Sequence, residues 1–271
     1  MKINTKKDGL TDKKYWEESY IRRTGEYNSF DKNDWKDLTA SQIFKKISNL
    51  IKDRKNIIEA GGGDGKFISA LAKENKDKNF FIIDYSEKGC ELAAERAYRE
   101  NVQIKILKND IFNPPENLIN FFDFIFSFGV AEHFTDLKWF LSAKKKFLKQ
   151  NGIMFTLIPN LKSPIYGKLC KSWNIEVYNS HIIHDAYSLK KGHEEAGLKV
   201  KDWGYFGSIE FGMLSMAIVK SKDPKRINEL IYLWLTRISK LIHLFEYFIF
   251  RFPPTSLFSP FIYVVSEKET L

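Results

Sequence analysis

The residues with the clearest chemical potential lie in the stretch IIEAGGGDGKF, at positions 57–67. An apolar run leads to Glu59, and four glycines occupy the five positions from Gly61 to Gly65. Glycines let the backbone approach a ligand closely, and a glycine turn between a strand and a helix places that ligand at the edge of a parallel sheet. The dinucleotide fingerprint would need a glycine at Lys66, and no Gly-Lys-Ser/Thr follows as a P-loop requires. The stretch therefore predicts a ligand-binding turn that lacks both phosphate-binding signatures.

Polar side chains follow the next two apolar runs. Asp84 ends the run 80–84, where a carboxylate can accept hydrogen bonds from both hydroxyls of a ribose. Asn109, Asp110 and Ile111 come after the run 102–107, and a polar acceptor beside an apolar residue suits the amino group and ring face of adenine. The spacing therefore predicts an adenosine ligand with no phosphate requirement.

His133 is the candidate for proton transfer, because it comes directly after the apolar run 122–128. A histidine can remove a proton from a hydroxyl nucleophile near neutral pH. The alternative is a histidine that is merely hydrogen-bonded at the start of a helix. His181, His184 and Asp185 are candidates of second rank.

Short apolar runs rich in Ile, Phe and Val alternate with helical patterns, which predicts a parallel sheet covered on both faces. The strands are expected at 57–60, 80–84, 102–107, 122–128, 153–158, 198–205 and 261–265, with 216–219 as a rival for the last. Helices are expected at 90–99, at 137–148 and at 188–196. Lys144, Lys145, Lys146 and Lys149 are expected to form a solvated helix end.

Length and composition favour one large domain in a reducing compartment. The chain has 271 residues, 44% of them hydrophobic, and a net charge of +9. Its lysines are scattered, which favours a solvated surface over a polyanionic partner. Cys90 and Cys170 have no metal-ligand spacing, and the polar first fourteen residues lack the apolar segment of a secretory signal. The expected location is the cytoplasm.

Two segments interrupt the alternating pattern. Residues 159–187 carry prolines, histidines and aromatic residues without a clear period, which indicates an insertion. Residues 226–252 predict a helix with an apolar stripe, and Lys222, Lys225, Arg226, Arg237 and Lys240 provide positive charge. Charged residues interrupt every stretch long enough to cross a bilayer. Two interpretations stay open: peripheral membrane contact through 226–252, or a helical pair that covers the active site or forms a homodimer contact.

Six segments, in order, resemble motifs of the class I S-adenosylmethionine-dependent methyltransferases, from about Tyr15 to Lys268. They are IIEAGGGDGKF, IIDYS, LKNDIF, FDFIFSFGVAEHF, LKQNGIMFTLIPN and HEEAGLKVKDWGYFG. The last two are similar to segments of the small-molecule O-methyltransferase branch. The resemblance implies an α/β, Rossmann-like, seven-stranded and mostly parallel sheet with helices on both faces, an antiparallel last strand and a helical insertion before it. It further implies an N-terminal helical cap at 1–54 and a methyltransferase domain at 55–271, with acceptor-side insertions at about 159–187 and 206–258.

The resemblance also implies S-adenosylmethionine as the cofactor. Glu59 and the glycine turn would hold its methionine portion, Asp84 its ribose and Asp110 its adenine. Tyr85 would pack on the adenine, and a segment similar to YWEESYIRRTGEY, with Tyr15, Trp16 and Tyr20, would close over the cofactor. The full set of expected cofactor-binding residues is Glu59, Ala60, Gly61, Gly63, Gly65, Asp84, Tyr85, Asn109, Asp110, Ile111, Phe128, Gly129 and Tyr20.

The expected reaction is methyl transfer to a hydroxyl of a sugar, glycan precursor or secondary metabolite, with His133 as the base. A ubiquinone-pathway relative can bind a divalent metal through Glu-x-x-Glu-His, but Gly129 replaces its first position here, so no metal is expected. Asn-Pro-Pro at 113–115 precedes the strand 122–128 instead of following it, which argues against nucleic-acid acceptors. N-methylation, RNA or protein methylation, NAD(P)-dependent oxidoreduction and non-catalytic cofactor binding stay as alternatives.

Overall fold

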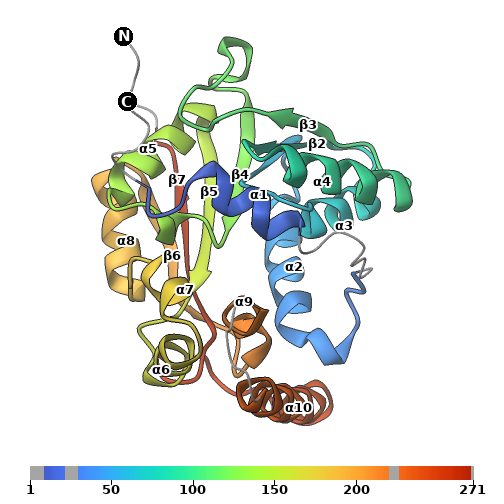
Figure 1. Ribbon diagram of the computed structural model, residues 1–271. Helices are drawn as coiled ribbons and strands as arrows, with labels where there is room; N and C mark the ends of the chain where they lie inside the picture. Colours follow the sequence, from blue (N-terminus) through green and yellow to red (C-terminus); the bar gives the residue numbers. More distant parts are fainter. Residues whose placement is uncertain (1–8, 22–29, 220–225, 270–271) are drawn as a thin grey trace.

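A seven-stranded sheet forms the centre of the computed structural model, which describes residues 9–21, 30–219 and 226–269 (Figure 1). The strand order is β3-β2-β1-β4-β5-β7-β6. The strands are β1 Asn56–Ala60, β2 Asn79–Asp84, β3 Lys105–Lys108, β4 Phe122–Phe128, β5 Leu148–Pro159, β6 Lys199–Phe206 and β7 Phe261–Glu267. The first five run parallel, and β7 pairs antiparallel with both β5 and β6. The predicted fold class, including its antiparallel last strand, is confirmed.

The strand order reverses between β1 and β4, which are neighbours in the sheet although β2 and β3 separate them in the chain. Crossovers to the two sides of such a point leave a crevice at the carboxyl ends of the strands, where ligands bind. The loops after β1, β2 and β4 therefore meet at one place.

Helices cover both faces of the sheet. The helical segments are α1 Lys13–Ile21, η1 Trp35–Asp37, α2 Leu38–Leu50, α3 Lys66–Glu74, α4 Glu87–Arg99, η2 Glu116–Leu118, η3 Ala131–His133, α5 Leu137–Phe147, α6 Pro164–Trp173, α7 Ile175–Asn179, α8 Ala186–Glu195, η4 Phe211–Leu214, α9 Ser215–Val219 and α10 Ile227–Phe248. Segments α5 and α8 pack on one face, and α2, α3 and α4 on the other (Figure 1). The domain boundary expected at residue 54 stays a prediction.

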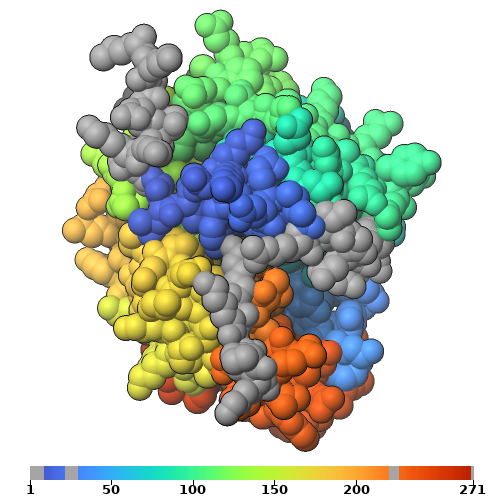
Figure 2. Space-filling view, in the orientation of Figure 1, coloured from blue at the N-terminus to red at the C-terminus, as the bar shows by residue number. Residues whose placement is uncertain are grey.

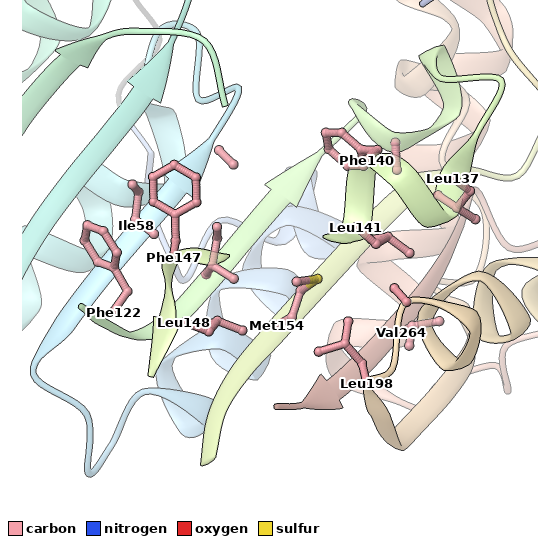
Figure 3. Packing of buried hydrophobic residues seen from close by; sticks show 14 of the residues in the cluster. Ile58, Phe122, Leu137, Phe140, Leu141, Phe147, Leu148, Met154, Leu198 and Val264 are labelled. Carbon is pink, nitrogen blue, oxygen red and sulfur yellow. The ribbon is translucent and has the colours of Figure 1, made fainter. Parts of the chain in front are cut away.

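The alternation of side chains along each strand divides the core into two layers. Ile58 faces the layer of α5 and α8, and its neighbour Ile57 faces the opposite layer. Figure 3 shows Ile58 and Met154 of the sheet packed with Leu141 and Phe147 of α5. The strands appear in the sequence as largely apolar runs because helices cover the sheet on both faces.

The main differences from the predicted elements lie at turns and insertions. Residues 102–104 belong to the turn after α4, where the Val102 amide donates to the Ala97 carbonyl, so β3 begins at Lys105. The rival strand at 216–219 is wrong, because these residues lie in α9. The helix predicted at 226–252 ends at Phe248, ahead of the two prolines.

One further expectation is corrected by burial. Lys144 is not part of a solvated helix end, since its side chain is fully buried and donates to the hydroxyls of Ser127 and Thr156 at 2.7 and 3.2 Å. The insertion expected at 159–187 forms α6 and α7. Together with η4 and α9 these helices build a third, smaller apolar cluster around Tyr166 and Trp173.

Candidate active site

A cavity of about 1080 Å³ opens at the carboxyl ends of β1, β2 and β4. Its walls come from α1, from the loops after these strands and after β3, and from both insertions. Segments that are far apart in the chain therefore meet around one space, as the topology of the sheet requires.

The turn after β1 needs glycine for two separate reasons. Gly61, Gly63 and Gly65 have φ values of +67°, +52° and +67°, which other residues rarely adopt. A Cβ on Gly61 would lie 2.7 Å from Val130 Cγ2, and one on Gly63 would lie 2.5 Å from Tyr20 Oη. The turn is therefore closely packed between the loop after β4 and helix α1.

Glu59 presents a buried carboxylate at the end of β1. Its side chain is 4% exposed, and its Oε2 atom has no hydrogen-bond donor among the described residues. Burial, followed by the nearby charge of Asp64, raises the pKa of Glu59 well above its ordinary value. Since an unpaired buried carboxylate is costly, a cationic ligand group that entered the cavity here would be strongly stabilised.

Asp84 links the ends of β1 and β2. Its two carboxylate oxygens accept hydrogen bonds from the backbone amides of Gly63 and Ser86 at 2.9 and 2.8 Å. Burial raises the pKa of Asp84, and these amide donors oppose that shift. Each oxygen keeps a further lone pair, so the pinned carboxylate can also accept from ligand hydroxyls.

The loop after β3 completes this half of the cavity. Asp110 and Ile111 line it next to Tyr85, whose pKa burial raises. The Asp110 carboxylate accepts from the Phe112 amide at 3.0 Å, which holds the loop in a tight turn. Asp110 and Ile111, the hydrogen-bond acceptor and the apolar residue expected to contact adenine, therefore both line the cavity.

Helix α1 lies over the glycine turn and crosses the face of the molecule shown in Figure 2. The carboxylate of Glu17 accepts from the first two amides of α4, those of Glu87 and Lys88, at 2.7 and 3.0 Å. A carboxylate at a helix N-terminus is favoured by the helix dipole. The Trp16 ring meets the His133 ring edge to face, with centroids 5.1 Å apart. Helix α1 therefore contacts both halves of the cavity. Residues 22–27, the last part of the segment YWEESYIRRTGEY, lie outside the described residues.

The second half of the cavity contains two histidines and a carboxylate. His133 Nδ1 lies 2.6 Å from the Ser180 carbonyl, and His181 Nδ1 lies 2.6 Å from the Val177 carbonyl. A carbonyl only accepts, so each Nδ1 atom carries a proton, and in the neutral form of each ring Nε2 is the nitrogen that can accept one. The two rings are 4.7 Å apart between centroids.

Glu132 joins this pair of histidines. It is 2% exposed, both carboxylate oxygens lack a hydrogen-bond donor among the described residues, and burial raises its pKa to about 8. Ligand atoms of Glu132, His133 and His181 all lie within 4.8 Å of one another. This donor set suits either proton transfer or a divalent cation, so the expectation of no metal stays a prediction.

Most of the expected cofactor-binding residues line the cavity, as does His133; the residues that do so are Glu59, Gly61, Gly63, Asp84, Tyr85, Asp110, Ile111, Phe128, Gly129, Tyr20 and His133. Three do not line it, because Ala60 is buried in the core, Gly65 packs on Ile82 at the start of α3, and the Asn109 side chain donates to the Asn113 carbonyl.

Two of the second-rank candidates also lie outside the cavity. Asp185 caps α8 by accepting from the Ser188 amide at 2.8 Å, and its neighbour His184 is 3.3 Å from the Ser188 hydroxyl. His181 alone of that group lines the cavity. No role was predicted for Glu17, and Glu132 entered only as the second glutamate of the incomplete Glu-x-x-Glu-His pattern. Adjacency to His133 was a signal for Glu132, whereas nothing in the sequence pointed to Glu17.

The comparisons with known proteins agree on one family. The family model of a methyltransferase domain matches residues 51–209. Ubiquinone biosynthesis O-methyltransferase of Pelagibacter ubique (strain HTCC1062) is 30% identical over 128 residues, which are 45% of this chain and 51% of that relative. The tRNA N(3)-methylcytidine methyltransferase trm140 of Schizosaccharomyces pombe is 32% identical over 87 residues, which are 30% of this chain and 26% of that relative. The matches thus span about half the length of one curated relative and a quarter of the other.

A solved structure shows the same fold over nearly the whole chain. Coclaurine N-methyltransferase, bound to N-methylheliamine and SAH, superposes with a TM-score of 0.59 over 97% of this chain and 83% of its own. At 12% identity this likeness concerns the fold alone.

Proposed function

This chain belongs to the class I S-adenosylmethionine-dependent methyltransferases, and from that premise we propose that it transfers the cofactor's methyl group to a hydroxyl of a small acceptor. The carrying observation is that one cavity joins the glycine turn, Glu59 and Asp84 to the pair His133 and His181. Cofactor recognition and proton transfer can therefore act on the same space.

The residues present fit the cofactor. The unpartnered Glu59 Oε2 suits the ammonium group of the methionine portion, because a cation there would compensate a buried carboxylate. Asp84, held by two backbone amides, suits the ribose hydroxyls. The absence of a Cβ at Gly61 and Gly63 lets the turn pack closely against Val130 and Tyr20 at the edge of the cavity. Tyr85, Asp110, Ile111, Phe128 and Gly129 are the remaining proposed contacts.

The chain's own residues orient the reactants, exclude water and move one proton. When bound, S-adenosylmethionine supplies an electrophilic methyl group on its sulfonium. Helix α1 is the proposed cap, since Tyr20 and Trp16 cover the two halves of the cavity. His133 Nε2 accepts the acceptor's hydroxyl proton as the oxygen attacks, and the Ser180 carbonyl stabilises the imidazolium through Nδ1–H.

A small acceptor is supported by the walls of the cavity opposite the cofactor-binding residues. They come from the insertions and are largely apolar, with Leu161, Cys170, Val177, Met213 and Leu214 among them. Such an apolar wall suits a compact, partly apolar molecule, including a sugar or glycan precursor with an apolar part. The O-methyltransferase relative favours a hydroxyl acceptor. The tRNA methyltransferase relative keeps RNA methylation as the second candidate.

Calorimetry with S-adenosylmethionine and with its demethylated product tests the cofactor half of the proposal. The wild-type chain should bind both. Asp84→Asn should weaken binding at least tenfold, because it replaces a charged acceptor by a neutral one, whereas Asp77→Asn on the surface should change nothing. Equal affinities for the two variants would contradict the proposed ribose contact.

The acceptor half is tested with methyl-labelled cofactor and mass spectrometry of the labelled product. His133→Asn should slow transfer by about 10²–10⁴-fold and remove the low-pH, ascending limb of the pH–rate profile, because the base must be unprotonated to accept the proton; cofactor affinity should be unchanged. A labelled RNA instead of a small molecule would favour the second candidate. Transfer by His133→Asn at the wild-type rate would exclude His133 as the base.

A further inference from the structure

Helix α10 buries polar residues and exposes apolar ones, the reverse of what is usual for a helix packed on a protein core. Its buried residues are Ser239, His243 and Glu246, while Trp234 and Leu241 are 64% and 67% exposed. An amphipathic helix normally buries its apolar stripe, so this orientation leaves apolar surface unpartnered in the monomer. Figure 1 shows α10 at the edge of the molecule, away from the sheet.

Polar contacts on the inner side hold α10 in this orientation. Ser239 Oγ accepts from the Phe211 amide at 3.0 Å, and His243 Nε2 lies 2.9 Å from the Ile209 carbonyl. The Glu246 carboxylate accepts from the Ser208 hydroxyl and from the Phe252 amide. Turning the apolar stripe inward would leave these buried polar groups unpaired, so the stripe is held outward.

The exposed apolar surface continues beyond the helix. We name as the docking face the exposed apolar residues of α10 and the segment after it: Ile227, Leu230, Ile231, Leu233, Trp234, Ile238, Leu241, Phe245, Tyr247, Phe248, Ile249, Phe250, Phe252, Leu257 and Phe258. The spacing within this set is helical. Leu230, Ile231, Trp234 and Ile238 lie three, four, seven and eleven residues after Ile227, which places all five residues in one row along the helix. Such an extended face is far larger than scattered surface hydrophobes.

We propose that the docking face binds the surface of an anionic lipid bilayer. Between residues 226 and 258 the basic residues other than histidine are Arg226, Arg237, Lys240 and Arg251, and all four are exposed. Of the two acids in that range, Glu246 is buried and Glu229 pairs with Arg226 at 2.7 Å. An apolar row with Trp and Phe, bordered by Arg and Lys, is the pattern of a helix that lies in a membrane interface.

The same charges argue against a second copy of this chain as the occupant. A two-fold contact through the docking face would bring Arg237 and Lys240 towards their own copies, and Glu229 is already paired. Anionic headgroups instead complement the basic residues outside that pair, Arg237, Lys240 and Arg251. Among the described residues no helix is long and apolar enough to span a bilayer, so α10 would lie in the interface.

Vesicle flotation of the full chain tests this proposal without reference to catalysis. The probes are phosphatidylcholine vesicles and mixed phosphatidylcholine and phosphatidylglycerol vesicles. Binding should be much stronger to the mixed vesicles and should weaken with added salt. Trp234 fluorescence, isolated by subtracting the spectrum of Trp234→Phe, should shift to shorter wavelength on binding.

Two variants with matched controls identify the surface. Leu241→Glu should abolish flotation, while Tyr98→Glu, at an 87% exposed site on α4, should not. The double variant Arg237→Gln and Lys240→Gln should weaken binding by about 20- to 30-fold, from the loss of two basic residues, whereas neutralising Lys73 and Lys76 should have little effect. Equal binding to both vesicle types would overturn the proposal. A wild-type dimer in sedimentation that Leu241→Glu converts to a monomer, without vesicle binding, would overturn it as well.

Discussion

Replacing Lys144 by methionine should stabilise the protein at neutral pH and destabilise it at high pH. The Lys144 ammonium is fully buried between β4 and β5, where desolvation lowers its pKa from 10.5 to about 7. Its contacts are two neutral hydroxyls, those of Ser127 and Thr156, with no carboxylate among them. Burying a charged lysine among neutral groups lowers the stability of the folded protein.

The magnitude follows from this pKa and its two hydrogen bonds. At pH 7 the shift corresponds to about 4 kcal/mol of lost stability. Methionine removes that cost and also removes two hydrogen bonds worth about 1 kcal/mol each, so the net gain at pH 7 is about 2 kcal/mol. Between pH 7 and 10.5 the unfolded wild-type chain binds more protons than the folded chain, so wild-type stability rises with pH. The variant's advantage should therefore vanish near pH 9 and reverse by about 2 kcal/mol near pH 10.5.

Urea unfolding at constant ionic strength between pH 7 and 10.5 measures this difference. Lys146→Met, at an exposed position on the same helix, is the control and should shift stability by less than about 0.5 kcal/mol at every pH. His193 does not interfere, because burial and then the Lys144 charge lower its pKa well below this range. A pH-independent difference between Lys144→Met and wild type would refute the argument that desolvation governs Lys144.

Two further outcomes follow from the cap and the glycine turn. Gly63→Ala places a Cβ 2.5 Å from Tyr20 Oη at a φ of +52°, so calorimetry should show at least tenfold weaker cofactor binding. The control is Gly197→Ala, at a φ of +69° far from the cavity. It should cost about 1 kcal/mol of stability and leave the cofactor affinity unchanged. Equal affinities would show that the contact with Tyr20 is unimportant. Glu17→Ala removes the acceptor for the first two amides of α4, so hydrogen exchange in α1 should rise without global unfolding; unchanged exchange would show that Glu17 does not hold the cap.

The sheet was predictable because its strands are buried on both faces and therefore appear as continuous apolar runs. The run 122–128 coincides with β4, and the position of Asp84 at the carboxyl end of β2 was sufficient to place it at the ligand edge. Parallel strands bring their carboxyl ends to one side, so residues that follow different strands meet without further information. Local order in the chain was enough for this half of the site.

The acceptor half was not predictable in the same way. Glu132 and His181 are far apart in the chain, and the 2.7 Å bond from the Ile182 amide to the Glu132 carbonyl brings their loops together. No periodic pattern encodes that contact, because it depends on how the insertion returns across the cavity. The hydrogen bonds between Glu17 and the first amides of α4 could not be predicted for the same reason.

The amino-acid sequence by itself determined the strand pattern, the glycine turn and the acids at or just after the carboxyl ends of the strands, because each depends on local spacing and on the regular geometry of parallel sheets. It also determined that α10 has an apolar stripe. Only the tertiary structure decided that this stripe faces outward, that Lys144 points into the core, and that His181 joins Glu132 and His133. Helical periodicity specifies which residues share a face, but the direction of that face is set by competing partners elsewhere in the chain, here the buried contacts of Ser239, His243 and Glu246.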